Sequence, residues 1–327
     1  MSWKSAKSTA TERRDAMQEF ADQIVASLEA GIKPWVKPWD ESKCGGPQAP
    51  INPTTGARYH GINVLILGIS LLAFQTGDPR WCSFLQAKEK GWNVRKGAKA
   101  TTIFFTKKLT VKDTKEDAGE DDEKTVRMLR HYPVFHASQI EGIPEFKPPG
   151  IDETPWRRPE AADLILQNTG AVIRIGGDRA FYSPSTDHIQ LPPDSAFRGP
   201  PEFAATALHE LGHWTGHQSR LNREEGMKAR YGSAAYAMEE LRAELSSAFI
   251  AGELGIPADI PQHASYIASW LPKLKEDKRA IFHAAADAQR IVDMVLGFHP
   301  DFAASVEPQP VRPSEPTAQQ SQERPAA

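Results

Sequence analysis

One short segment restricts the possible folds of this chain more than any other: His209-Glu210-Leu211-Gly212-His213. It lies within an apolar helical pattern that follows Pro200 and continues to Thr215. Residues four positions apart lie on one face of a helix, so the two imidazoles can bind a single Zn²⁺ ion. Glu210 would then lie beside the open coordination position and could accept a proton from water. The segment therefore predicts a helical zinc site with a general base.

A catalytic zinc site needs a third protein ligand, and the sequence offers several. The HExxHxxGxxH pattern of some zinc peptidases is excluded, because the position of its third histidine holds Ser219. His217 is closer, but it would have to bend back from the end of the same helix. The next helical pattern, from Ala234 to Leu254, places Glu240 and Glu244 on one face, whereas Glu239 should point elsewhere. The residues alone leave His217, Glu240 and Glu244 open as ligands.

The charge of the chain is unevenly distributed, although the net charge of its 327 residues is only -3. Residues 1–112 carry 17 Lys and Arg against 9 Asp and Glu, whereas residues 113–123 carry seven acids and one Lys. The basic first part favours a polyanionic partner, with an ordinary solvated surface as the alternative.

The basic part contains the residue types expected at a single-stranded nucleic-acid surface. Its periodicity predicts helices at 17–28 and 62–74, a strand at 101–106, and a solvated acidic loop at 113–123 before strand pairing resumes. Cations can follow phosphates while aromatic rings stack on bases. The alternative is that Trp81, Phe84 and Phe104 are core residues. The predicted nucleic-acid contacts are Tyr59, Trp81, Lys88, Trp92, Arg95, Lys96, Lys99 and Lys107.

Five prolines between Pro144 and Pro159 predict a linker between two domains. The second part should contain a helix at 160–168, short hairpin strands at 171–175, 180–182 and 189–191 with a turn at Gly176-Gly177-Asp178, and long helices. We expect an α+β protein with a DNA-binding domain and a mainly helical domain carrying a small sheet. The expected divisions are 8–142 (single-stranded-nucleic-acid-binding domain), 143–159 (Pro-rich linker), 160–302 (domain with the HExxH segment) and 303–327 (disordered tail).

The remaining features concern the compartment. Cys44 and Cys82 form no CxxC motif, so neither a disulfide scaffold nor a thiolate zinc site is expected. The longest apolar run, at 62–74, is too short to span a bilayer, and the residues after Met1 contain no apolar signal core. We expect a cytoplasmic protein that does not bind a membrane.

Motifs in both halves resemble those of ArdC-type antirestriction proteins. In the first half these include Asn52-Pro-Thr-Thr-Gly56, Tyr59-His-Gly-Ile-Asn63 and Gly91-Trp-Asn-Val-Arg-Lys-Gly97, and in the second half the strings at 209–217 and 236–244. The resemblance covers about residues 10 to 300. It implies a single-stranded-DNA-binding domain fused to a zincin-like metallopeptidase domain. Such proteins belong to conjugative plasmids or related mobile elements and protect incoming DNA from host restriction.

The string Glu240-Leu-Arg-Ala-Glu244 resembles the ExxA(D/N) arrangement of several zincins. That resemblance implies that Glu240 is the third metal ligand. It also implies that Glu244 holds the imidazole of His209 or His213, with Glu244 on the metal as the alternative. Three function classes remain open: a zinc peptidase brought to DNA, a passive DNA shield with a structural metal, and a non-catalytic interaction module. The protein substrate of the peptidase is unknown, with host restriction components as candidates.

Overall fold

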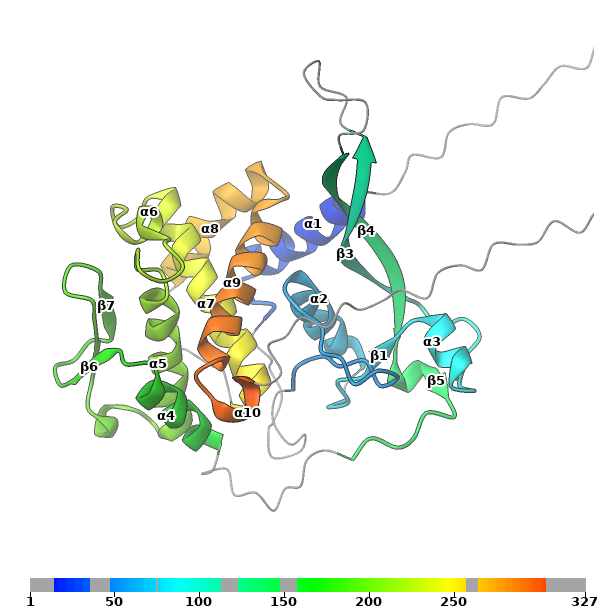
Figure 1. The fold of residues 1–327 in the computed structure, drawn as a ribbon, viewed down its shortest axis with the longest axis horizontal. Helices are drawn as coiled ribbons and strands as arrows, with labels where there is room; N and C mark the ends of the chain where they lie inside the picture. Colours follow the sequence, from blue (N-terminus) through cyan, green and yellow to red (C-terminus); the bar gives the residue numbers. More distant parts are fainter. Residues whose placement is uncertain are drawn as a thin grey trace, which may run out of the picture.

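The computed structural model describes residues 15–35, 48–74, 76–112, 123–147, 158–256 and 264–303. It has a two-domain α+β architecture of helices and small sheets (Figure 1). The elements of the first half are α1 (Ala16–Glu29), α2 (Ile62–Leu71), η2 (Leu72–Phe74), β1 (Trp81–Cys82), α3 (Phe84–Glu89), β2 (Asn93–Val94), β3 (Thr101–Lys112), β4 (Glu123–His136), η3 (Ala137–Gln139) and β5 (Ile140–Glu141).

The two predicted helices of the first half are confirmed. Asp15 caps α1 by accepting a hydrogen bond from the backbone N–H of Gln18, and Phe20, Ile24 and Leu28 form its buried face. The capping box expected from Thr9 to Glu12 lies outside the described residues. No helix in the described part of the chain is both long and apolar enough to cross a membrane.

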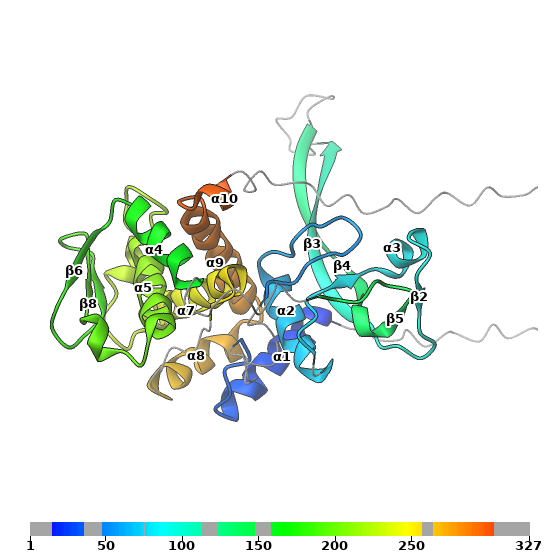
Figure 2. The same cartoon turned by 90° about the horizontal axis from the view of Figure 1, so that it is seen from below.

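Strands β3 and β4 form a long antiparallel hairpin that extends away from the helices (Figures 1 and 2). The register runs from Thr101 opposite Val134 to Lys112 opposite Glu123. The strand expected at 101–106 therefore continues six residues further. Glu123, expected at the end of the acidic loop, is the first residue of β4, and residues 113–122 lie outside the described residues.

The second half contains a small sheet and most of the helices. A hairpin between β6 and β7 at Gly176-Gly177-Asp178 was the wrong prediction, because β6 pairs in parallel with β8 and only β7 pairs antiparallel with β8. β8 is therefore the central strand, and its Ile189 and Leu191 are fully buried. The elements are α4 (Arg158–Asn168), β6 (Val172–Ile175), β7 (Phe181–Ser183), β8 (His188–Leu191), η4 (Asp194–Ala196), α5 (Pro200–Trp214), α6 (Glu224–Met227), α7 (Ala234–Leu254), α8 (Ala264–Glu276), α9 (Ala280–Leu296) and α10 (Pro300–Ala303).

The two halves share one hydrophobic core. Helix α1 packs against α8, and α2 packs against α9, as both views show (Figures 1 and 2). Phe282 of α9 contacts Phe20 of α1 and Phe104 of β3 edge to face, with ring centroids 6.1 and 5.1 Å apart. The predicted linker between the halves lies mostly outside the described residues, at 148–157, so its limits and those of the tail remain predictions.

Candidate metal centre and nucleic-acid surface

Helix α5 holds the HExxH segment against α7. Gly199 precedes the helix, and prolines occupy its first positions, where their missing N–H groups cost no hydrogen bond. A Cβ atom on Gly212 would lie 3.0 Å from Ser246 Oγ, so glycine allows α5 to approach α7 closely. His209 and Glu210 are buried. The ligand face of α5 is therefore largely covered by α7.

Three side chains on α5 and α7 bring ligand atoms together. Glu240 Oε2 lies 3.7 Å from His209 Nε2, and Glu240 Oε1 lies 3.6 Å from His213 Nε2. These separations are longer than a normal hydrogen bond. Ligand atoms that share one tetrahedral Zn²⁺ ion, each about 2.1 Å from it, lie roughly 3.4 Å apart. Among the described residues, His209, His213 and Glu240 are the group that could hold a metal ion.

The electrostatic field at this group favours positive charge. Burial alone would lower the pKa of His213, but the carboxylates of Glu239, Glu240 and Glu210 reverse this and raise its pKa above the usual value. Burial alone would raise the pKa of Glu240, but the two imidazoles hold its pKa far below the usual range. Carboxylates that attract a proton to an imidazole also attract a cation, so the site is electrostatically suited to a divalent ion.

The structure corrects the prediction that Glu239 points elsewhere. Glu239 is only 2% exposed, and its Oε1 lies 3.6 Å from His213 Nδ1, the ring nitrogen that faces away from Glu240. Arg223 holds this carboxylate by donating a hydrogen bond of 2.9 Å from Nη2. A Cβ atom on Gly226 would lie 3.0 Å from Glu239 Cβ, so glycine there leaves room for this arrangement. The pairing depends on how α6 and α7 pack, which no local pattern encodes.

The structure also corrects the role expected for Glu244. Its Oε1 accepts hydrogen bonds from Lys33 Nζ at 3.1 Å and Trp35 Nε1 at 3.2 Å. His209 Nδ1, which Glu244 could have held, is buried without a hydrogen-bond partner among the described residues. His217 instead lies 2.8 Å from Ser219 Oγ through its Nδ1. Neither Glu244 nor His217 joins the ligand group in the described part of the chain.

A cleft of about 720 Å³ gives access to the ligand group and to Glu210. Tyr182 of β7 donates a hydrogen bond of 2.7 Å to Asp187, which also accepts one of 3.1 Å from Arg220. Arg220 also donates from Nε to the carbonyl of Trp214, the last residue of α5, at 2.6 Å, so this network connects β7 to α5. The aromatic residues that line the cleft are Phe181, Tyr182, Phe197, Tyr231 and Tyr236. The cleft can therefore accept an apolar chain next to the ligand group.

The predicted nucleic-acid residues divide into exposed cations and buried rings. Lys88 lies on α3, and Arg95, Lys96 and Lys99 follow β2; all four are exposed, and α3 contacts β2. Trp92 is half-buried against the small core formed by Cys82, Ala87 and Ile140. Lys107 belongs to β3, but its side chain lies outside the described residues. Four of the predicted cations thus lie on one exposed region, which we call the α3–β2 surface.

Tyr59 and Trp81 were wrong predictions for base stacking, because both rings are buried. Trp81 is fully buried, and Tyr59 donates its hydroxyl to the Trp81 carbonyl at 2.8 Å. In contrast, Phe84 and Leu85 at the start of α3 are each 51% exposed. Phe84, which the alternative interpretation placed in the core, is therefore an exposed ring that the predicted nucleic-acid contacts did not include. Its proximity to Lys88 in one short helix was the available signal.

Family models match both halves of the chain. A model of the N-terminal domain of anti-restriction factor ArdC matches residues 14–135, and a zincin-like metallopeptidase model matches residues 160–287. The metal-free crystal structure of the antirestriction protein ArdC from plasmid R388 is 37% identical, with a TM-score of 0.72; the match covers 88% of this chain and 99% of that one. The chain belongs to the ArdC family of antirestriction proteins.

Other ArdC-like sequences and structures extend the comparison. The Mn(II)-bound structure of the R388 protein is 36% identical with a TM-score of 0.70, covering 88% of this chain and all of that one. An uncharacterized protein of Sinorhizobium fredii, y4eC, is 37% identical, covering 85% of this chain and 91% of its own length. DNA primase TraC of Escherichia coli is 44% identical over 296 residues, which are 86% of this chain. The chain spans only about a quarter of the length of that primase.

Proposed function

We propose that this protein is an antirestriction protein of a mobile element that binds single-stranded DNA and carries a catalytic metal site. It would act in the cytoplasm on a host protein, with restriction components as candidates. The observation that carries the metal site is the spacing of His209, His213 and Glu240, with both Glu240 oxygens at metal-sharing distances from the imidazoles. The ArdC family membership supports protection from restriction.

We propose Zn²⁺ as the native ion, held by His209, His213 and Glu240. When bound, it would supply a Lewis acid that polarises a peptide carbonyl and acidifies water. Glu210, buried next to His209 on α5, would accept the proton from the attacking water and deliver it to the leaving nitrogen. The aromatic cleft would hold the peptide, and its walls would limit access of bulk water. These roles describe a zinc-dependent peptidase.

The alternative function is a passive shield, in which the protein covers single strands and the metal site is structural. The exposed cations of the α3–β2 surface would suffice for that role. Glu210 favours the enzyme, because a structural zinc site closes with a fourth protein ligand and needs no base.

The first prediction concerns the α3–β2 surface. Replacing Arg95, Lys96 and Lys99 together by alanine should weaken binding of single-stranded DNA at least about tenfold at low salt, because three phosphate contacts are removed. The slope of log affinity against log salt should also become less steep by roughly two units. Fluorescence anisotropy with a labelled oligonucleotide measures both quantities.

The matched control for this prediction removes the same charge elsewhere. Arg174, Lys228 and Arg230 are exposed cations in the second half, and their replacement by alanine should change affinity and salt slope little. Equal weakening in the two triple variants would mean that net charge, rather than the α3–β2 surface, determines binding.

The second prediction ranks three carboxylates by their effect on metal affinity. Glu240→Ala should nearly eliminate metal, because it removes a ligand. Glu239→Gln should weaken the metal about 10- to 100-fold, the usual cost of losing the partner of a ligand histidine. Glu244→Gln should have the smallest effect, since its carboxylate contacts Lys33 and Trp35. Competition with a chromogenic chelator measures the order.

A reversed order between Glu239→Gln and Glu244→Gln would contradict the proposed role of Glu239. Thermal unfolding of the metal-free variants provides the control. Glu244→Gln should lower the melting temperature without metal, because the largely buried Lys33 loses its anionic partner.

A further inference from the structure

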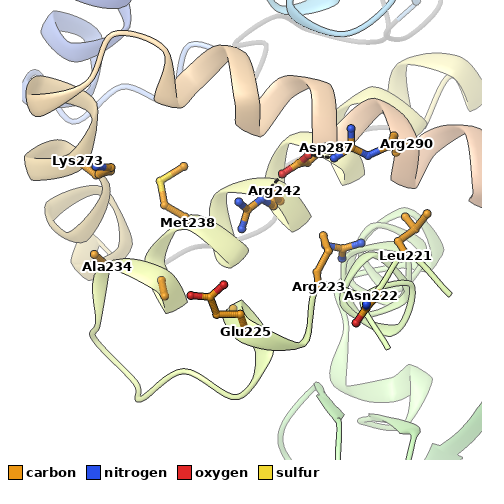
Figure 3. Close-up of a pocket in the computed structure, with 12 residues that line it drawn as sticks. Leu221, Asn222, Arg223, Glu225, Ala234, Met238, Arg242, Lys273, Asp287 and Arg290 are labelled. Atoms are coloured by element: carbon orange, nitrogen blue, oxygen red, sulfur yellow. Dashed lines mark hydrogen bonds and ion pairs between the residues drawn. The ribbon is translucent and has the colours of Figure 1, made fainter. Parts of the chain in front are cut away.

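A second pocket, of about 430 Å³, lies between the loop before α6 and helices α7, α8 and α9 (Figure 3). Among the described residues, Gly226 alone lines both this pocket and the cleft at the metal-ligand group. The volume lies within the range of small-molecule sites, about 300–1,000 Å³, and exceeds what an inorganic anion alone would fill. The proposed function uses no residue of this pocket other than Arg223 and Gly226, which support Glu239.

One wall of this pocket is apolar and another is cationic. Leu221, Ala234, Ala235 and Met238 supply apolar surface. Figure 3 shows Arg242 between Met238 and Asp287, with Arg290 beyond Asp287 and Lys273 at the far end of the pocket. The described lining contains four cations and two acids, Glu225 and Asp287. Two acids outside the lining also pair with these cations: Glu239 with Arg223 and Arg242, and Glu276 with Lys273. Guanidinium and ammonium groups therefore gather beside an apolar surface, and the exposed Arg290 is the one most accessible to a ligand.

The pair Arg242 and Arg290 retains donors for a ligand. Arg242 donates from Nε to Asp287 Oδ2 at 2.6 Å, and Arg290 donates to the other oxygen of the same carboxylate. Arg242 Nη1 also lies 3.5 Å from Glu239 Oε2, whereas the Arg290 side chain is 63% exposed. Each guanidinium has five N–H groups, so both retain donors that these carboxylates do not use. Arg223, in contrast, donates to Glu239, Gly212 O and Thr215 Oγ1, so its hydrogen-bonding groups are already engaged.

We propose that this pocket binds a phosphate monoester carried on a flat apolar group, the chemistry of a nucleoside monophosphate. The phosphate would accept hydrogen bonds from Arg242 and Arg290, since guanidinium groups match phosphate geometry in a bidentate way. The base would lie on the alanines and on Met238, whose flexible thioether adapts to an aromatic ring. The same chemistry occurs in a free nucleotide and at the 5′-phosphorylated end of a DNA strand.

Isothermal titration calorimetry of the full chain tests this site with three probes. Deoxyadenosine monophosphate should bind at least about tenfold more tightly than deoxyadenosine, which lacks the phosphate, and than inorganic phosphate, which lacks the base. Arg290→Gln should weaken the nucleotide at least about tenfold. Ala235→Trp, a substitution at an exposed position that lines the pocket, should abolish binding by filling it. Lys228→Gln, an exposed lysine outside the pocket, should change nothing.

A fourth probe distinguishes a free nucleotide from the 5′-phosphorylated end of a DNA strand. This probe is a 5′-phosphorylated trinucleotide, compared with its 5′-hydroxyl form. The part of the affinity that Arg290→Gln removes belongs to the pocket rather than to the α3–β2 surface. If Arg290→Gln weakens the phosphorylated trinucleotide more than it weakens the mononucleotide, the site binds a DNA end. If it weakens the mononucleotide more, the site binds a free nucleotide. The proposal is overturned if the nucleotide binds no more tightly than deoxyadenosine, or if neither Arg290→Gln nor Ala235→Trp weakens it.

Discussion

Replacing both histidines by alanine, in His209→Ala/His213→Ala, should reduce bound metal from about one equivalent per chain to none. The two imidazoles supply two of the three proposed ligand atoms, and Glu240 alone cannot retain an ion against solvent. Elemental analysis of protein purified without added metal measures the content. This is the largest effect that the structure predicts on any bound species.

Two controls accompany the double variant. His217→Ala should keep full metal content, because His217 lies at the end of α5 and contacts Ser219 instead. Binding of single-stranded DNA by the double variant should equal that of the unmodified protein, since the α3–β2 surface lies in the other half of the chain. Stoichiometric metal in the double variant would refute the proposed site.

Glu210→Gln should abolish peptidase turnover and antirestriction while metal and DNA binding are kept. The substitution preserves the size of the side chain and removes only its ability to accept a proton. General-base catalysis contributes about 10²- to 10⁴-fold, so residual activity should lie below one percent. The assay is transfer of an unmodified plasmid into a restricting host, with Glu224→Gln on α6 as the matched control.

Retention of full protection by Glu210→Gln, with metal bound, would instead support passive shielding. If protection is lost, the Glu210→Gln variant can also be used to identify the substrate. A variant that binds its protein substrate without cleaving it keeps that substrate bound. Proteins captured by Glu210→Gln and not by Glu240→Ala would be candidates for the host substrate.

The helices of the site could be predicted from sequence because their signals are local. Helix α7 has the predicted limits, from Ala234 to Leu254, and α5 begins and ends within one residue of expectation. The spacing of His209 and His213 sufficed to predict a shared ligand face. The relative position of two residues four apart on one helix can be predicted without knowledge of the rest of the fold.

Contacts between distant segments could not be predicted in this way. Glu239 and Glu244 lie on the same helix, and what each carboxylate contacts depends on Arg223 and Lys33, which come from other segments. The parallel pairing of β6 with β8 likewise required a crossover that a Gly-Gly turn does not indicate. Trp81 has a residue type suited to stacking on bases, but type does not determine burial.

The position of Phe282 between Phe20 and Phe104 bears on how such proteins can be rearranged during evolution. A recombination event that transferred only one half would leave Phe282, or both of its partners, exposed to water and prone to aggregation. The unit that can be inherited intact therefore extends from α1 to α9. The match to the much longer TraC primase covers 86% of this chain, so it includes residues of both halves.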